Sequence, residues 1–419
     1  GKDMPLHNGS GNSLLTTDKV ANDMLARWKN NLVLTKGVYR DLEQQFGEIG
    51  DTINVKLPNN AIVNEGRVAT TTTPLNDKTV ALVIDTQKNI KFNWTMKDKK
   101  LSIQQFGQRY LEPASNLLAN HVDMAVANVM RDAYFQFGTP NNALDIEDVT
   151  MGQSYAQDVA IPTDSLCRLI TNTIDKANIT MGVTALAANA PVREAIAKGY
   201  GGEIAGFETF YSQNIIKHLV GDHAGTETVA TELQNGNQLD VEAGAVGGLV
   251  RGDRFTIAGV YEINPITKQR TGRLQVFSVI SDGGMAGAAD TVTISPTMNN
   301  GTGTTLDGEG SSITTTMDQN VDGVAAVGAA IIVIGDAGGM YRENFIMHRD
   351  AIALAMVFLD LPASGHGSRA SDAQTGLNIS VSEYFNGDQN ENAMRMDILF
   401  GTKMVRPDLI FRATCQKIG

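Results

Sequence analysis

Residues 222–340 differ in composition from the rest of the chain, and this break limits the folds that the whole sequence can adopt. The segment holds 20 of the 42 glycines and 15 threonines, with 14 acidic and 5 basic residues. Short β-branched and aromatic runs at 253–263, 272–280 and 290–296 are separated by turn-forming residues, as in a small β-barrel or sandwich. We therefore expect a separate all-β module that is inserted into the chain.

The flanks of this module mix helical and strand patterns, so we expect an α+β chain. Helical patterns, in which apolar residues recur three or four positions apart, lie at 13–46, 98–137, 163–178 and 344–356. In the second of these, Asp98 or Ser102 can cap the first turn, and Pro113 is expected to kink or restart the helix.

Strand patterns at 53–57 and 79–95 flank a long polar link that is rich in threonine. Two strands joined in this way predict a protruding hairpin. Because an isolated hairpin is only marginally stable, this one is expected to need a partner surface.

Catalytic and metal-binding patterns are not met in this sequence. His348-Arg349-Asp350 has the letters of a kinase catalytic loop, but Ala355 stands where that loop needs a metal-binding Asn. No two histidines have the i, i+4 spacing of a zinc helix, and Cys167 and Cys415 have no ligand partners nearby. We expect both cysteines to be buried as small hydrophobic side chains. We predict no enzyme, no catalytic or metal-binding residue and no cofactor.

The charge balance is 34 basic against 46 acidic residues, a net charge of −12. Sequence-independent DNA binding needs an excess of Lys and Arg that displaces counterions from phosphates, and this chain has none. The sequence contains no run of 18 or more apolar residues, so we predict no membrane-spanning helix. The N-terminus has no signal-peptide pattern, which gives no support for export.

Arg251-Gly252-Asp253 stands at the first strand of the module and admits two interpretations. In an exported adhesin or surface-layer protein, this tripeptide can be a ligand for cell-adhesion receptors. Alternatively it is a turn, in which Gly252 supplies a permissive backbone and Asp253 starts the strand. We favour the structural turn.

Several stretches taken together resemble one known family. "GGLVRGDRFTIAGV" (247–260), followed by "LQVFSVISD" and "DTVTISP", resembles the inserted β-barrel of the coat proteins of short-tailed Salmonella-type phages. The stretches 201–215, 344–356 and 395–414 are similar to parts of tailed-phage major capsid proteins with the Hong Kong 97-type fold. The resemblance covers most of 40–419 in order.

The resemblance implies a division of the chain into the parts of that fold. These are an N-terminal arm (1–46), an extended β-hairpin loop (47–97), the spine helix of the peripheral domain (98–138), the first part of the axial domain (139–221), the inserted β-barrel domain (222–340) and the completion of the axial and peripheral domains (341–419).

It also implies the function of a major capsid protein. Copies would form pentamers and hexamers of an icosahedral head that encloses double-stranded DNA without sequence-specific binding. The head would be assembled in the bacterial host cytoplasm, with a scaffolding protein and a portal as further partners. Glu65 and Arg67 at the hairpin tip, with Asp98 and Lys99, are expected to make polar contacts between subunits. An encapsulin-like nanocompartment shell, which has the same fold but encloses enzymes, remains an alternative.

Overall fold

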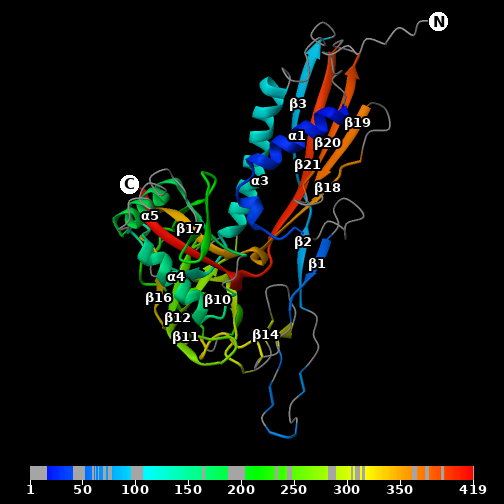
Figure 1. Ribbon diagram of the computed structural model, residues 1–419. Coiled ribbons are helices and arrows are strands. Elements are labelled where there is room, and N and C mark those ends of the chain that lie inside the picture. The colour runs from blue at the N-terminus through cyan, green and yellow to red at the C-terminus, as the bar shows by residue number, and fades with distance from the viewer. Residues whose placement is uncertain are drawn as a thin grey trace, which may run out of the picture.

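The computed structural model describes most of the chain in long continuous segments (Figure 1). The described residues are 17–40, 52–58, 61, 63–64, 66–68, 72–73, 78–95, 107–162, 166–186, 203–231, 235–242, 248–281, 289–302, 305–306, 312–313, 317–360, 366–372, 377–387 and 391–418.

One end of the molecule is a sheet covered by two helices. Strands β18 (Ile352–Val357), β21 (Glu391–Met404), β20 (Leu377–Asn386) and β19 (His366–Asp372) lie in that order, and β3 (Thr86–Thr95) pairs with β21 along its whole length. Helices α1 (Thr17–Asn31) and α3 (Glu112–Met130) pack side by side on one face of this sheet (Figure 1). Successive strand side chains point to opposite faces, so alternate residues such as Met394, Met396 and Ile398 form the core under the helices.

A buried carboxylate joins the segment after α1 to the middle of α3. Asp123, which is 1% exposed, accepts hydrogen bonds from the backbone N–H groups of Val33, Leu34 and Thr35 at 3.0, 3.3 and 3.1 Å. The Thr35 hydroxyl donates to the same carboxylate at 2.7 Å. These donors begin the short 3-10 helix η1 (Leu34–Gly37), so Asp123 caps it from another helix.

The long helix predicted over 98–137 is shorter in the described residues. A π-helical turn, η3 (Gly107–Leu111), leads into α3, and Pro113 lies in the first turn of α3, where its missing N–H costs nothing. Of the two predicted alternatives, a kink or a new helix start at Pro113, the structure shows the helix start. The helix ends at Met130 because the chain continues into β4 (Phe135–Gln136). Asp98 and Ser102 lie outside the described residues.

The middle of the molecule is a seven-stranded mixed sheet. Its order is β4–β22 (Ile410–Ile418)–β17 (Met340–His348)–β5 (Cys167–Thr171)–β7 (Phe207–Tyr211)–β6 (Glu203–Ile204), and β8 (Lys217–Leu219) pairs with the start of β17. Helix α4 (Ile146–Asp158) begins at a capping box in which Asp145 and Asp148 bind each other's backbone N–H. Its Tyr155 packs edge-on against Phe135 and Phe411, which joins α4 to the sheet.

The helix predicted over 344–356 is wrong, and the helix predicted over 163–178 is wrong in its first part. Residues 344–356 form the end of β17, a 3-10 turn η4 (Arg349–Ala351) and β18, and residues 163–178 contain β5 before α5 (Thr173–Leu186) begins. All three strands are buried on both faces over most of their length, and such a strand is a continuous apolar run that periodicity cannot distinguish from a buried helix. The polar His348-Arg349-Asp350 forms the turn between two buried strands.

The segment 222–340 folds as a β-barrel with its own core. Its strands follow the order β16 (Ile331–Val333)–β11 (Arg254–Ile263)–β12 (Arg270–Val279)–β13 (Ala289–Met298)–β10 (Gly236–Glu242)–β9 (Thr228–Val229). Backbone hydrogen bonds from Ile331 to Glu227 and from Val229 to Ala329 join the two edges and close the barrel. Fifteen buried apolar residues, including Phe255 and Phe277, fill it. A two-residue pair, β14 (Thr305–Leu306) with β15 (Ser312–Ile313), lies outside this sheet.

The chain enters and leaves the barrel at neighbouring points. Leu219 of β8 pairs with Met340 of β17, and the Val220 N–H donates to the Gly339 carbonyl at 2.9 Å. The Gly338 N–H donates to the Gly221 carbonyl at 3.2 Å. We call these six residues on two adjacent segments, Leu219–Gly221 and Gly338–Met340, the neck.

An antiparallel ribbon extends from the five-stranded sheet of β18, β21, β20, β19 and β3. Strand β1 (Thr52–Lys56) pairs with β2 (Thr79–Val83), with Ile53 opposite Leu82, which confirms the predicted pairing of the hairpin. A small apolar cluster holds the base of the ribbon against β18 and β21. The described residues of the loop beyond it are largely exposed, with Val63 at 89%, and Figure 1 shows the loop extending away from the body.

Candidate structural junction and assembly surfaces

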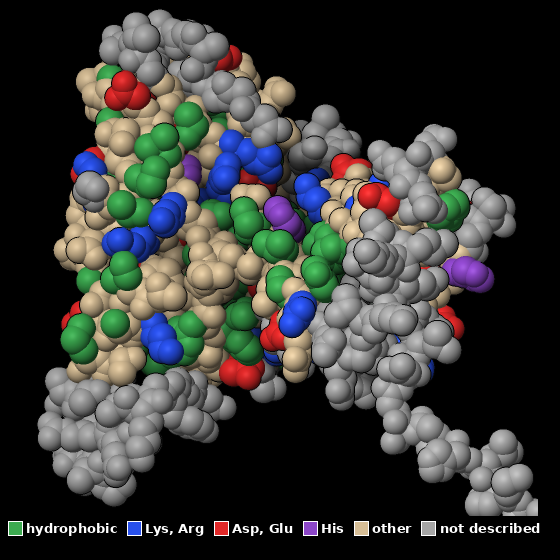
Figure 2. Space-filling view, turned by 90° about the horizontal axis from the view of Figure 1, so that it is seen from above, with side chains coloured by type: hydrophobic (Ala, Val, Ile, Leu, Met, Phe, Trp, Pro, Cys, Tyr) green, Lys and Arg blue, Asp and Glu red, His purple; other side chains and the backbone are tan. Residues whose placement is uncertain are grey.

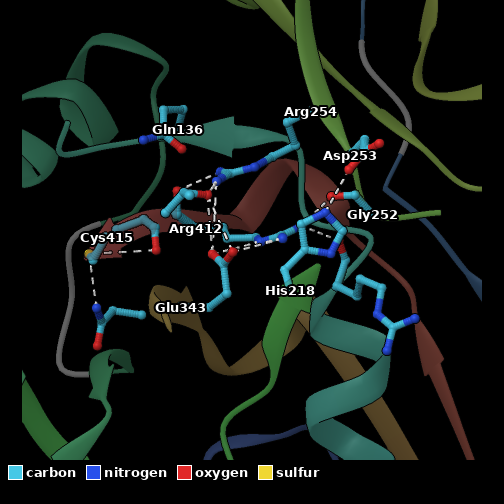
Figure 3. Close-up of polar contacts among 12 residues, drawn as sticks. Gln136, His218, Gly252, Asp253, Arg254, Glu343, Arg412 and Cys415 are labelled. Carbon is cyan, nitrogen blue, oxygen red and sulfur yellow. Dashed lines mark hydrogen bonds and ion pairs between the residues drawn. The ribbon is translucent and has the colours of Figure 1, made fainter. Parts of the chain in front are cut away.

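Three charged side chains with almost no exposure meet where the barrel joins the rest of the molecule (Figure 3). Arg412 of β22 forms a bidentate pair with Glu343 of β17, with N–O distances of 2.9 and 3.0 Å. Arg254, the first residue of β11, lies 3.9 Å from the same carboxylate and donates to the Thr414 hydroxyl. We call Arg254, Glu343 and Arg412 the buried charge cluster.

The two guanidinium groups also bind backbone carbonyls from separate parts of the fold. Arg412 Nη1 donates to the carbonyls of Arg131, after α3, and Gly252, before the barrel, at 2.7 and 2.8 Å. Arg254 Nη1 donates to the Phe135 and Arg412 carbonyls at 3.1 and 2.6 Å. Buried charges are tolerated when they are paired and hydrogen-bonded, and here Glu343, the Thr414 hydroxyl and four backbone carbonyls accept from the two guanidinium groups.

Burial acts strongly on the ionisation of Arg254. Burial, and after it the charge of Arg412, lower the pKa of Arg254 to about 9, against the opposing effect of Glu343. The guanidinium therefore stays protonated at neutral pH. Because breaking one member would leave another charge buried without its partner, the cluster fixes the barrel in one orientation.

The Arg251-Gly252-Asp253 tripeptide is the turn that leads into this cluster. Gly252 has φ of +91°, and a Cβ there would lie 2.3 Å from Cγ of Arg131. The Asp253 carboxylate is 1% exposed, lies 2.8 Å from Nε2 of His218 and accepts the N–H groups of Gly221 and Val250. An adhesion receptor needs that carboxylate at the surface, so the turn interpretation accounts for the tripeptide.

Two more contacts fasten the same junction. Arg251 forms a bidentate pair with Asp132 just after α3, at 3.1 and 2.9 Å. Burial, and then the nearby charge of Arg412, lowers the pKa of His218, although Asp253 acts in the opposite direction. His218 is therefore neutral at pH 7, and its Nε2–H donates to Asp253.

The Cys415 thiol contacts the Asn344 amide at 3.1 Å, and burial raises its pKa well above the usual value, so it remains an unreactive thiol. Both cysteines are free and buried, as predicted. Within the described ranges, no three metal-ligating side chains come together. No helix among them is long and apolar enough to cross a membrane.

The predicted contact residues are only partly described. Arg67 lies exposed on the loop of the β1–β2 ribbon, whereas Glu65, Asp98 and Lys99 lie outside the described residues. Of these four residues the structure places only Arg67, so the contacts stay a prediction.

Sequence reasoning missed the buried charge cluster and His218. A weak signal was present, because Arg254 and Arg412 each stand within an otherwise apolar strand pattern, "RFTI" and "LIFRAT". A charged residue inside a buried strand requires a partner. The partner Glu343, however, is 69 residues from Arg412 and cannot be chosen from the sequence.

Exposed apolar side chains offer surface for contacts with other molecules. Tyr110, Leu117 and Met124 recur at seven-residue intervals along η3 and α3 and are 41%, 57% and 48% exposed. On the face seen in Figure 2, hydrophobic side chains are intermingled with Lys and Arg side chains. Large exposed apolar side chains on several elements are typical of proteins that bind partners.

Comparisons with known proteins identify the class. A family model described as "P22 coat protein - gene protein 5" matches residues 11–411. A comparison with curated proteins found no match. Because the family model extends over nearly the whole chain, the protein is a major capsid protein of a tailed bacteriophage, a structural protein of the icosahedral head. The chain belongs to the P22 coat protein family, with the Hong Kong 97-type fold and an inserted β-barrel.

The solved structures that match this chain include phage capsid proteins. A structure described as "Mycobacterium phage Che8" is 10% identical and covers 91% of this chain and 90% of its own, with a TM-score of 0.45. The capsid of Ralstonia phage GP4 is 10% identical and covers 94% and 91%, with a TM-score of 0.42. The CUS-3 coat protein I-domain is 31% identical and covers 26% of this chain and 96% of its own, with a TM-score of 0.19. The family match does not favour the encapsulin-like or adhesin alternatives.

Proposed function

We propose that copies of this chain form pentamers and hexamers, and that each subunit reaches its neighbour with the β1–β2 ribbon. The observation that carries this proposal is the exposure of the ribbon loop, in which Val63 and Val68 are 89% and 68% exposed. Apolar side chains held this far from their own core gain by packing against another molecule. Glu65, Arg67, Asp98 and Lys99 would supply polar contacts between the subunits.

The parts of the fold would divide the work of the shell. Under this proposal the N-terminal arm (1–46) and the extended hairpin (47–97) bind neighbouring subunits. The spine (98–138) gives length, and the axial domain (139–221 and part of 341–419) surrounds the symmetry axis. The inserted barrel (222–340) is fixed to this frame by the buried charge cluster.

The shell would enclose double-stranded DNA without binding its phosphates tightly. With a net charge of −12, the subunit has no excess of cations to release phosphate counterions. We therefore propose a purely structural role without catalysis, in which assembly occurs in the host cytoplasm with a scaffolding protein and a portal as partners.

A shortened ribbon tests the role of the loop. The Leu57 N–H donates to the Lys78 carbonyl at 2.8 Å, so the strands are already close enough for a two-residue turn. Deleting 59–76 and changing Pro58→Asn and Asp77→Gly would close them with a favoured Asn-Gly hairpin. We expect folded, soluble subunits that form no closed shells when co-expressed with the scaffolding protein.

The matched controls are the wild type and a variant whose residues 59–76 are replaced by a Gly/Ser sequence of equal length. The deletion variant must keep the wild-type circular dichroism spectrum, which separates failed assembly from failed folding. Closed particles of normal size from the deletion variant, seen by electron microscopy, would refute the proposal. Normal particles from the Gly/Ser variant alone would show that reach, and not side-chain contact, is what assembly requires.

A further inference from the structure

An ion pair links the ribbon to the inserted barrel. Lys78 directly precedes β2, and its Nζ lies 2.5 Å from Oδ2 of Asp318, which belongs to the connection between β15 and β16. The two side chains are only 20% and 10% exposed. An ion pair this shielded from solvent is screened less by salt than a surface pair.

The barrel holds Asp318 in place from two sides. Lys268, in the turn between β11 and β12, donates to the carbonyls of Met317 and Gln319 at 2.7 and 3.1 Å. The Asn320 side chain donates to the Thr297 carbonyl at 2.7 Å. Asp318 is thus presented from a segment whose backbone is fastened to β13 and to the β11–β12 turn.

The ribbon and the barrel face each other across a cavity of about 730 Å³. Leu57 and Val80 line it from the ribbon, and Ile263 and Ile266 line it from the barrel. The segment 403–409, from the last two residues of β21 to the start of β22, lines it as well. Side chains on opposite walls of a cavity of this size do not pack against each other. A contact that crosses the cavity therefore helps to fix the angle between ribbon and barrel.

Lys268 completes a small group of charges around the crossing point. Burial lowers the pKa of Lys268, which Asp318 opposes and Lys78 reinforces. Asp318 therefore lies between two lysines, one from its own domain and one from the ribbon. Removing its charge would leave these two lysines repelling each other, so ribbon and barrel would separate.

We propose that Lys78 and Asp318 form a latch through which the inserted barrel sets the direction of the β1–β2 ribbon and thereby the geometry of contacts between subunits. The first half concerns a single subunit. The second half rests on the proposed function, because it requires that the ribbon contacts a neighbouring copy.

The first experiment measures the ribbon angle in soluble full-length subunits. Nitroxide labels at Arg67→Cys, on the ribbon loop, and Val327→Cys, an exposed position of the barrel, report one distance by double electron–electron resonance. We expect a narrow distance distribution in the wild-type background and loss of the narrow peak in Asp318→Asn. The control Glu242→Gln removes one charge from an exposed position of the same barrel and should keep the peak.

Lys78→Met tests the latch from the ribbon side, in case Asp318→Asn disturbs the barrel. The exchange variant Lys78→Asp with Asp318→Lys rebuilds the pair in reverse and should restore the narrow peak. An unchanged distance distribution in both Asp318→Asn and Lys78→Met, with wild-type circular dichroism spectra, would overturn the latch.

The second experiment scores particles formed with the scaffolding protein. We expect Asp318→Asn to give aberrant or open particles, and the exchange variant to recover closed shells. A changed distance distribution together with normal particles would overturn the link from the latch to assembly. If wild-type chains formed no shells at all, the proposed function would fail, while the resonance result would still decide the latch.

Discussion

Gly252 allows the strength of the junction to be predicted from the structure. Its φ of +91° lies where side chains other than glycine are strained, and the strain costs roughly 1–2 kcal/mol. An added Cβ would also lie 2.3 Å from Cγ and 2.6 Å from Cδ of Arg131, and 3.2 Å from Cε1 of His218. Overpacking of this kind costs typically about 1–3 kcal/mol. Gly252→Ala should therefore destabilise the protein by about 2–5 kcal/mol.

Gly259 supplies the matched control. It lies in β11 with φ of +84°, and nothing lies within 4 Å of the Cβ that an alanine would add. Gly259→Ala thus measures backbone strain alone, about 1–2 kcal/mol. The difference between the two variants, about 1–3 kcal/mol, isolates the contact with Arg131 and His218.

The assay is urea unfolding of full-length subunits followed by far-UV circular dichroism, with free energies taken by linear extrapolation. Gly252→Val should be the most destabilised of the three variants, because a β-branched residue resists positive φ most strongly. If Gly252→Ala is no less stable than Gly259→Ala, the contact argument is wrong. If neither is destabilised, the strain argument is wrong as well.

Three further predictions concern the titrating and buried charges. The pKa of His218 is lower in the folded protein than its ordinary value of 6.5. The stability that neutral His218 contributes is therefore present above pH 6.5 and is lost as the pH falls through the folded-state pKa. In His218→Gln, the unfolding free energy should fall less steeply below about pH 6.5 than in the wild type. Burial raises the pKa of Glu262 above 4.5, so the stability that its neutral form contributes is full below pH 4.5 and is lost as pH rises. In urea titrations from pH 4.5 upward, the wild type should therefore lose stability relative to Glu262→Gln. Parallel curves of unfolding free energy against pH for the two proteins would contradict this. Arg412→Met should cost about 3–5 kcal/mol in the same assay, because it leaves Glu343 buried without its bidentate partner. Arg369→Met, which removes a surface pair, should cost less than about 1 kcal/mol, and an equal cost for the two would refute the argument.

Features that depend on local sequence could be predicted, because composition and turn residues are local. The Gly- and Thr-rich break indicated the inserted β module, and the alternation at 53–57 indicated the ribbon strand β1. The β-barrel or sandwich alternative could not be decided, since closure depends on Ile331 meeting Glu227, two residues that are far apart in the sequence. Helices were predicted wrongly where strands are buried on both faces, as at 344–356.

The junction could not be predicted because its members come from distant parts of the chain. Arg254 and Arg412 each stand out as charges in apolar strands, but their common partner Glu343 follows only from the sheet order β22–β17. The tripeptide at 251–253 was recognisable as a turn, whereas its contacts with Asp132 and His218 depend on where α3 ends and on β8. The division into parts of the shell stays a prediction.

The neck is the place where both chain connections between the barrel and the central sheet lie side by side. Because the chain leaves the central sheet at Leu219 and returns to it at Met340, directly opposite, a hairpin could bridge that gap without moving either strand. The buried charge cluster opposes such an excision, since losing Arg254 would strip the Phe135 and Arg412 carbonyls of their donor. Foreign sequences are therefore best grafted outside the stretch 251–254 and away from Lys268 and Asp318, so that this anchorage and the latch stay intact.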